Sequence, residues 1–286
     1  MEIYFIDGCK HNQHPNQPCM NDPNYYPQFQ TNLNAFKTLI INLVNTNSSS
    51  TFLHFGDGDY YFLKCIELGS AKPGKRALSV PYNQINIQKF RDGLPQNDYI
   101  CVEIFEPSNI EKFISLYPNI TPAFPTEYLY GLTANNWFTS TFKGQIGLIG
   151  AGEKLDMIID LLQYEEYQKY LGLTEFTDYI KLPQKFACDN LLHTIEIVSQ
   201  QLTKSSTHTK IFLCGMGHVK SGLLHELKKI KPAIYIDVGC GIDALAGIID
   251  PDRPYMKSRI NYQIKKHIPN IDLLQFDNHS NVKFLN

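Results

Sequence analysis

The chain has 286 residues, of which 26 are basic and 28 acidic, and its formal net charge at pH 7 is −2. This length is sufficient for one large α/β domain with a substantial core, and we expect a single domain over residues 1–286. The near-neutral balance lacks the basic excess of nucleic-acid-binding domains, so we expect no nucleic-acid partner. No apolar run approaches the ~20 residues that span a bilayer, and the first residues lack a signal-peptide pattern. These features predict a soluble, cytoplasmic protein.

The cysteines argue against a disulfide framework, because there are seven of them, spread along the chain. Four possible zinc ligands gather near the N-terminus, but their spacing fits none of the common zinc patterns. Asn, Gln and Pro surround them, as in loops, so we predict a polar loop there. These four residues are Cys9, His11, His14 and Cys19.

Short β-type runs alternate with helical periods, which is typical of a Rossmann-like α/β fold with a mostly parallel sheet and helices on both faces. In chain order we predict strand 2–6, helix 32–45, strand 51–55, helix 59–68, helix 85–91, strand 98–103, strand 145–149, helix 154–162, strand 177–182, helix 186–202, strand 210–214, helix 218–229 and strand 233–237. Residues 105–144 hold scattered aromatic residues and prolines. We predict a connector or an acceptor-side lobe there.

Four predicted strands lead into glycine-containing turns. Open α/β sheets bind ligands at the carboxyl ends of their strands, so turns after parallel strands line one edge of the sheet. Each turn alone is accounted for by a tight strand-to-helix connection, whereas four together favour at least one ligand site. The turns are Gly56–Asp59, Gly150–Gly152, Gly215–His218 and Asp237–Asp243.

The first turn, Gly56-Asp57-Gly58-Asp59, places two carboxylates directly after an apolar strand. On an extended backbone, residues at i and i+2 point the same way. Asp57 and Asp59 would then offer Mg²⁺ or Mn²⁺ a pair of hard oxygen ligands, and Gly56 and Gly58 would let a diphosphate approach the backbone. The same composition is common in solvated turns. A metal–diphosphate site and a solvated turn both remain open.

A small basic cluster follows this turn at Lys72, Lys75 and Arg76, in a loop that contains Pro73-Gly74. These cations would offset the charge of a diphosphate. The loop is not a Walker A motif, because Arg76 stands where that motif requires Ser or Thr. Solvation of the cluster is the alternative.

Two nucleotide-binding alternatives come from the later turns. The Asp237-Val-Gly239-Cys-Gly241 segment resembles the first motif of S-adenosylmethionine-dependent enzymes, but fewer than 50 residues follow it. The turns at Gly150 and Gly215 do not complete G-x-G-x-x-G and lack the acidic ribose ligand expected ~20 residues later. An S-adenosylmethionine- or NAD-binding enzyme and a non-catalytic nucleotide-binding protein remain the alternatives.

Residues 52–63, Phe-Leu-His-Phe-Gly-Asp-Gly-Asp-Tyr-Tyr-Phe-Leu, resemble the R-x-G-D-G-E segment of GT-D-type glycosyltransferases, where a D-x-E pair binds a divalent metal and a nucleotide-sugar. The Gly215-x-Gly217 turn, then Ala-Ile-Tyr-Ile-Asp-Val-Gly over 233–239 and Asp243, resembles the C-terminal half of that family. At the level of motifs the resemblance covers residues 50–80 and 205–250.

Three residues depart from the family pattern. Asp59 stands where glutamate is usual, which keeps a carboxylate. His54 replaces the typical arginine, which alters one cationic contact. Cys240 occupies the place where histidine often follows the glycine, which puts any role of that histidine in doubt.

The resemblance implies a GT-D-like fold and a glycosyltransferase that moves a sugar from a nucleotide-diphosphate sugar, with a UDP-sugar favoured, to a hydroxyl of a glycan or glycoconjugate. Asp57 and Asp59 would hold Mn²⁺ or Mg²⁺, which stabilises charge on the leaving diphosphate. The predicted donor-binding residues are Gly56, Gly58, Lys72, Lys75, Arg76, Gly215, Gly217 and His218.

An inverting transfer needs a group that takes the proton of the acceptor hydroxyl. Positions at strand ends make Glu103, Asp237 and Asp243 the candidates. Aromatic side chains stack on sugar rings, and Tyr128, Tyr130 and Trp137 are candidates for that contact with the acceptor. Core packing is the alternative for each aromatic residue.

Overall fold

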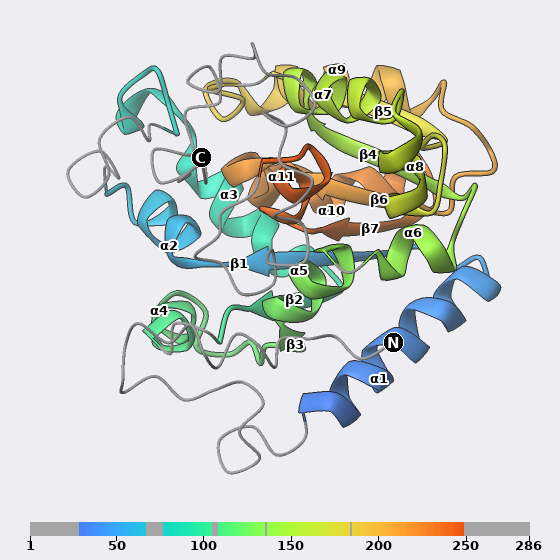
Figure 1. The fold of residues 1–286 in the computed structure, drawn as a ribbon. Coiled ribbons are helices and arrows are strands. Elements are labelled where there is room, and N and C mark those ends of the chain that lie inside the picture. The colour runs from blue at the N-terminus through green and yellow to red at the C-terminus, as the bar shows by residue number, and fades with distance from the viewer. Residues whose placement is uncertain (1–28, 67–76, 105–107, 135, 184, 249–286) are drawn as a thin grey trace, which may run out of the picture.

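The computed structural model describes residues 29–66, 77–104, 108–134, 136–183 and 185–248 (Figure 1). Seven strands form one sheet in the order β3-β2-β1-β7-β6-β4-β5, and every neighbouring pair is parallel. The strands are β1 Ser50–Phe55, β2 Tyr99–Val102, β3 Phe124–Pro125, β4 Ile146–Ala151, β5 Asp178–Leu182, β6 Ile211–Gly215 and β7 Ile234–Asp237. The predicted α/β fold with a parallel sheet is confirmed.

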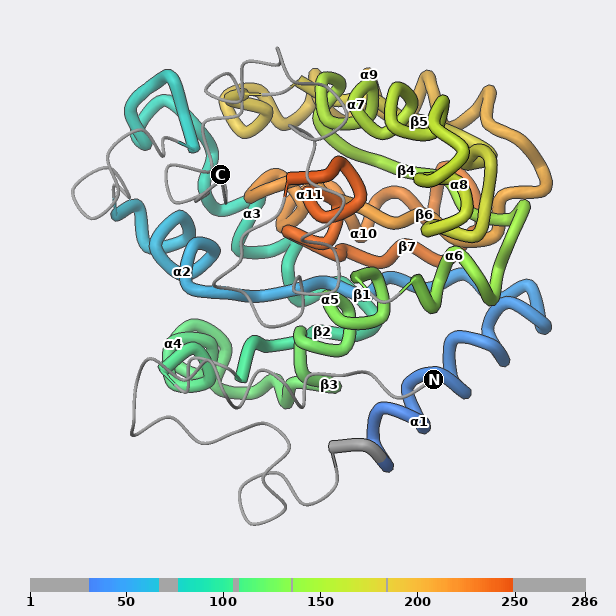
Figure 2. The backbone as a smooth tube through the Cα atoms, in the orientation of Figure 1, coloured from blue at the N-terminus to red at the C-terminus, as the bar shows by residue number. Residues whose placement is uncertain are grey.

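Helices cover both faces of the sheet, and Figure 2 traces the chain through them. Successive strand residues point to opposite faces, so Phe52 belongs to one core cluster and Leu53 to the other. The face of Leu53 is covered by α2 Asp57–Leu63, α3 Ile87–Gly93, α4 Ser108–Leu116, α9 Leu191–Leu202 and α10 Lys220–Ile230. The face of Phe52 is covered by α1 Phe29–Asn45, α5 Thr126–Ala134, α6 Trp137–Thr141, α7 Gly152–Leu161, α8 Glu165–Leu171 and α11 Gly241–Leu245.

Helix α1 docks through an apolar stripe of helical spacing. Leu33, Phe36 and Ile40 are fully buried. The Phe36 ring centroid lies 5.6 Å from that of Phe52 on β1 and 4.9 Å from that of Phe124 on β3. Burial of such a stripe supplies most of the stability of a helix this short, so the predicted helix over 32–45 is confirmed.

The segment predicted as a connector or lobe, residues 105–144, continues the α/β fold wherever it is described. It contains α4, β3, α5 and α6, and β3 pairs with β2 at Cys101 and Phe124. A two-residue strand is too short to show an alternating pattern. Helix α5 is buried on every side and therefore has no polar face to mark its period.

The predictions for the first residues of the chain are not tested. The predicted strand 2–6 and the cysteine–histidine segment 9–19 lie outside the described residues. Among the helices that are described, none has the length and hydrophobicity of a bilayer-spanning segment.

Helix α3 packs on α10 so closely that Gly93 has no room for a side chain. A Cβ at Gly93 would lie 2.7 Å from His225 Cε1 and closer still to the carbonyl oxygen of Ser221. Because a backbone atom cannot easily yield, Gly93→Ala is expected to lower the free energy of unfolding by about 1–3 kcal/mol in denaturant titrations. Gly152, also helical, is the matched control.

A Cβ at Gly152 would meet nothing nearer than 3.8 Å. Gly152→Ala is therefore expected to be neutral or to stabilise the protein by up to about 1 kcal/mol. Equal losses in the Gly93 and Gly152 variants would contradict the close contact between α3 and α10.

Candidate functional site

The carboxyl ends of the central strands meet where their connections diverge. Strands β1 and β6 lead into α2 and α10 on one face, whereas β7, which lies between them, leads into α11 on the other. Strand β4, beside β6, leads into α7 on the face of α11. In open α/β sheets, ligands bind at such a divergence. We therefore expect a ligand site at the edge of the sheet formed by β1, β7, β6 and β4.

Asp57-Gly58-Asp59 forms the first turn of α2 rather than an extended segment. Gly56 precedes the helix, and its N–H donates to Asp59 Oδ2 at 3.0 Å. Residues two apart in a helix project about 200° apart around the axis. The expectation that Asp57 and Asp59 point the same way is therefore wrong. Carboxylates stabilise a helix N-terminus by capping its N–H groups and matching its dipole, which favours helix here.

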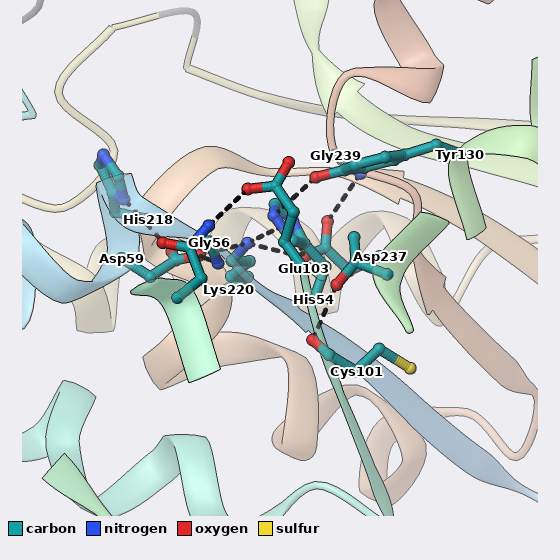
Figure 3. A network of polar contacts seen from close by, with 12 residues as sticks. His54, Gly56, Asp59, Cys101, Glu103, Tyr130, His218, Lys220, Asp237 and Gly239 are labelled. Carbon is teal, nitrogen blue, oxygen red and sulfur yellow. Dashed lines mark hydrogen bonds and ion pairs between the residues drawn. The ribbon is translucent and has the colours of Figure 1, made fainter. Parts of the chain in front are cut away.

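Lys220, the first residue of α10, contacts side chains at the carboxyl ends of β1 and β7. Its side chain is buried, and Nζ lies 3.0 Å from Asp59 Oδ2, 2.9 Å from Asp237 Oδ2 and 2.8 Å from His54 Nδ1 (Figure 3). The contact with His54 is a hydrogen bond, and the contacts with the two aspartates are ion pairs. We call the group around it the polar cluster: His54, Asp59, Tyr130, His218, Lys220 and Asp237.

The strand pattern explains how the polar cluster assembles. His54 has the orientation of Phe52 and reaches α5, where its Nε2 lies 2.7 Å from the Tyr130 hydroxyl. Asp237 has the opposite orientation to Ile236 and faces α10, where Lys220 lies. Parallel strands thus bring groups far apart in sequence to one edge.

The carboxyl groups of the polar cluster are ionised. Asp59 is 3% and Asp237 0% exposed, and burial raises the pKa of each. The pKa nevertheless ends below its ordinary value in both, because the Lys220 ammonium favours the charged form, and His218 adds a hydrogen bond to Asp59. Burial lowers the pKa of Lys220, but the two carboxylates raise it above its ordinary value. The buried part of the polar cluster therefore holds two negative charges, on Asp59 and Asp237, and one positive charge, on Lys220.

Lys220 also fixes the tautomer of His54. An ammonium only donates, so His54 Nδ1 accepts at 2.8 Å, a shorter contact than the 3.4 Å to Asp237 Oδ2. The proton of the neutral ring is then on Nε2, which donates to the Tyr130 hydroxyl.

The structure places several predicted residues at this edge. A Cβ on Gly56 would lie 3.6 Å from Glu103 Oε2, so Glu103 stands beside the α2 turn. Glu103 is partly exposed, and its Oε2 accepts from Asn109 Nδ2 at 2.7 Å. Gly217 is exposed, with a φ of +57° that favours glycine. A Cβ on Gly58 would lie 3.0 Å from His218 Cε1.

The remaining predicted residues are not placed at the polar cluster by the structure. Asp243 is not at a strand end but within α11, where its buried carboxylate forms an ion pair with Lys154 of α7 at 2.5 Å. A Cβ on Gly215 would overlap Ile242, so packing of α11 already explains that glycine. The predicted cations Lys72, Lys75 and Arg76 lie outside the described residues.

The aromatic candidates are part of the core. Tyr128 is fully buried and Tyr130 nearly so, which removes both from contact with an acceptor sugar. The Trp137 ring packs edge-on against Phe138 and Phe142. Core packing is therefore the better interpretation of these rings.

The sequence-based prediction missed Lys220, although the chain carries a signal for it. Lys220 stands three, four and seven residues before Leu223, Leu224 and Leu227, which form the buried stripe of α10. A lysine on an apolar stripe must find buried anions, and the strand-end aspartates supply them.

The residues present fit a divalent cation only in part. Within the described ranges no group of three or more His, Cys, Asp and Glu side chains is placed to hold a metal ion. Asp59 accepts from Gly56 and pairs with Lys220 and His218, so it does not fit as a metal ligand. Asp57 is partly exposed and fits, because Mg²⁺ is commonly held by one or two carboxylates together with substrate phosphates.

Comparisons of the chain with protein-family models, with curated protein sequences and with solved structures found no match. The functional assignment therefore depends on the motifs of the chain and on the geometry at the sheet edge.

Proposed function

We propose that the protein is a glycosyltransferase, which moves a sugar from a nucleotide-diphosphate sugar to an acceptor hydroxyl. One observation carries the proposal. Two segments carry motifs that resemble those of GT-D-type enzymes, residues 50–80 and 205–250. They meet in the polar cluster, where Lys220 pairs with Asp59 after β1 and with Asp237 at the end of β7. Motifs that were separate in the sequence form one site at the edge where α/β folds bind nucleotides.

The donor diphosphate would lie over the α2 turn at Asp57 and over the exposed Gly217 of the turn before α10. Gly217 and His218 lead into α10, whose N-terminus carries partial positive charge that favours phosphate. Asp57 is the residue that would hold Mg²⁺ or Mn²⁺. Such an ion stabilises negative charge on a leaving diphosphate.

Burial of the polar cluster disfavours the other nucleotide-binding alternatives. A carboxylate that binds the ribose of S-adenosylmethionine or NAD must be within reach of the ligand. Asp237, the acidic residue of that motif, is fully buried and paired with Lys220. Of the three predicted proton acceptors, Asp237 and Asp243 are buried in ion pairs, and Glu103 is the partly exposed one.

A thermal-shift screen tests the proposed function. UDP-, GDP- and dTDP-sugars, NAD(H) and S-adenosylmethionine are each added with and without Mn²⁺. We expect a nucleotide-diphosphate sugar to raise Tm more with Mn²⁺ than without it, with a stabilisation of about 2.7 kcal/mol when the ligand is at about 100 times its Kd.

Asp57→Asn is expected to remove the Mn²⁺-dependent part of this shift. Asp160→Asn, an exposed site on α7, is the matched control and is expected to keep it. Stabilisation by NAD(H) or S-adenosylmethionine alone, or an undiminished Mn²⁺ effect in Asp57→Asn, would contradict the proposal.

A further inference from the structure

We propose that Asp59 and His218 form a proton-accepting pair, in which Asp59 holds the His218 ring with its proton on Nδ1 and leaves Nε2 to take the proton of the acceptor hydroxyl. The inference rests on the proposed function and deepens it, because it names the general base. None of the three carboxylates predicted from the sequence has that role in it.

The tautomer of His218 follows from its partner. His218 Nδ1 lies 3.3 Å from Asp59 Oδ1. The carboxylate oxygen is the acceptor in this contact, so we place the ring proton on Nδ1, which leaves the lone pair on Nε2. Asp59 is itself held in place, because its other oxygen accepts from Gly56 N–H and pairs with Lys220.

The ring is held in one orientation from both sides. It stacks on Phe62 with a centroid distance of 5.1 Å and an interplanar angle of 8°. On the side of Gly58, a Cβ would lie only 3.0 Å from His218 Cε1, so glycine leaves the room that the ring occupies. The second ring nitrogen points away from Asp59 in Figure 3, and the side chain is 22% exposed.

The other imidazole of the polar cluster has the opposite arrangement. His54 accepts through Nδ1 from Lys220 and donates through Nε2 to Tyr130, so both of its nitrogens are engaged within the protein. His218 is therefore the histidine of the polar cluster that presents an unprotonated nitrogen at the edge of the sheet.

In the proposed reaction, the acceptor hydroxyl displaces the diphosphate from the sugar in a single step. His218 Nε2 takes the proton of the acceptor hydroxyl while the oxygen forms a bond to the anomeric carbon. The bond from that carbon to the diphosphate oxygen breaks, and its electron pair leaves with the diphosphate. His218 becomes an imidazolium, which the Asp59 carboxylate stabilises. Attack opposite the leaving group inverts the anomeric configuration.

The first test needs no substrate. Long-range ¹⁵N–¹H NMR of the full chain, at a pH where the rings are neutral, distinguishes protonated from unprotonated ring nitrogens. His218→Gln and His54→Gln assign the signals by their loss. We expect the proton on Nδ1 of His218 and on Nε2 of His54. A proton on Nε2 of His218 overturns the inference, whether or not any donor binds.

The second test measures turnover of the nucleotide-diphosphate sugar that gives the largest thermal shift. His218→Gln is expected to lower kcat by about 10²- to 10⁴-fold with little change in the donor KM. Gly58→Ala is expected to lower kcat by about 10-fold, because its methyl group displaces the ring. His193→Gln, at an exposed histidine on α9, is the matched control and is expected to match wild type.

Two outcomes overturn the inference while leaving the proposed function intact. One is a kcat in His218→Gln within about 3-fold of wild type. The other is a product that retains the anomeric configuration of the donor. Failure of every nucleotide-sugar to bind would instead refute the proposed function, and the NMR result would still decide the tautomer of His218.

Discussion

Replacing Lys220 with methionine is expected to lower the free energy of unfolding by about 3–5 kcal/mol, because the change leaves two buried carboxylates without their shared cation. Asp59 and Asp237 both lie within 3.0 Å of the Lys220 ammonium. Methionine keeps most of the side-chain volume, so the loss reports charge rather than packing. Denaturant unfolding at pH 7 measures it.

A second substitution and a pH series separate this effect from general damage. Lys220→Met with Asp237→Asn removes one of the two buried charges and is expected to recover a large part of the loss. Without Lys220, burial raises the pKa of the remaining carboxyl groups, so protonation then favours the folded state.

The free energy of unfolding therefore changes with pH in opposite directions in wild type and in Lys220→Met. In wild type, the lowered carboxyl pKa values contribute stability above the unfolded pKa of about 4, and this is lost as pH falls through the folded values. As the pH falls from about 7 to about 5, the free energy of unfolding of Lys220→Met is expected to rise relative to that of wild type. A loss at pH 7 of less than about 1 kcal/mol would contradict a paired, buried ammonium.

Asp59→Asn and Asp57→Asn are expected to have unequal effects on stability, although the two aspartates are separated by one residue. Asp59→Asn is expected to cost about 2–4 kcal/mol in the presence of a chelator, because the change removes the charge that pairs with Lys220 and His218. Asp57→Asn is expected to stay within about 0.5 kcal/mol of wild type, since Asp57 is at a partly exposed site.

The comparison distinguishes an ion-pair anchor from a metal ligand at position 59. Thermal unfolding of both variants with Mn²⁺ and with EDTA gives the answer. If Asp59→Asn lost stability only in the presence of Mn²⁺, Asp59 would be a metal ligand, contrary to its place in the polar cluster.

The sheet was largely predictable from the sequence. Buried parallel strands read as apolar runs bounded by turn residues, and six described strands were predicted to within two residues of their observed bounds. Strand β3 was missed, because two residues carry no periodicity. Helix starts were predicted less well. The helix predicted from Phe186 begins at Leu191, and α2 begins two residues earlier than predicted.

The site was predictable as a place but not as an arrangement. Glycine turns after parallel strands correctly indicated that Gly56–Asp59, Gly215–His218 and Asp237 share one edge of the sheet. The direction of Asp59 was not predictable from composition, because it depends on whether the D-G-D segment is extended or helical. The partner of Asp59 is Lys220, which another strand and turn bring to it, so no local pattern contains that pairing.

The central claim is that the carboxyl ends of β1, β7 and β6 form a site for a nucleotide-diphosphate sugar. Its most direct test is a crystal structure of the protein with UDP and Mn²⁺. We expect the diphosphate beside Asp57 and Gly217, with Lys220 still bridging Asp59 and Asp237. A crystal saturated with UDP that shows no nucleotide there, or a Mn²⁺ ion bound to Asp59 in place of the Lys220 ammonium, would contradict it.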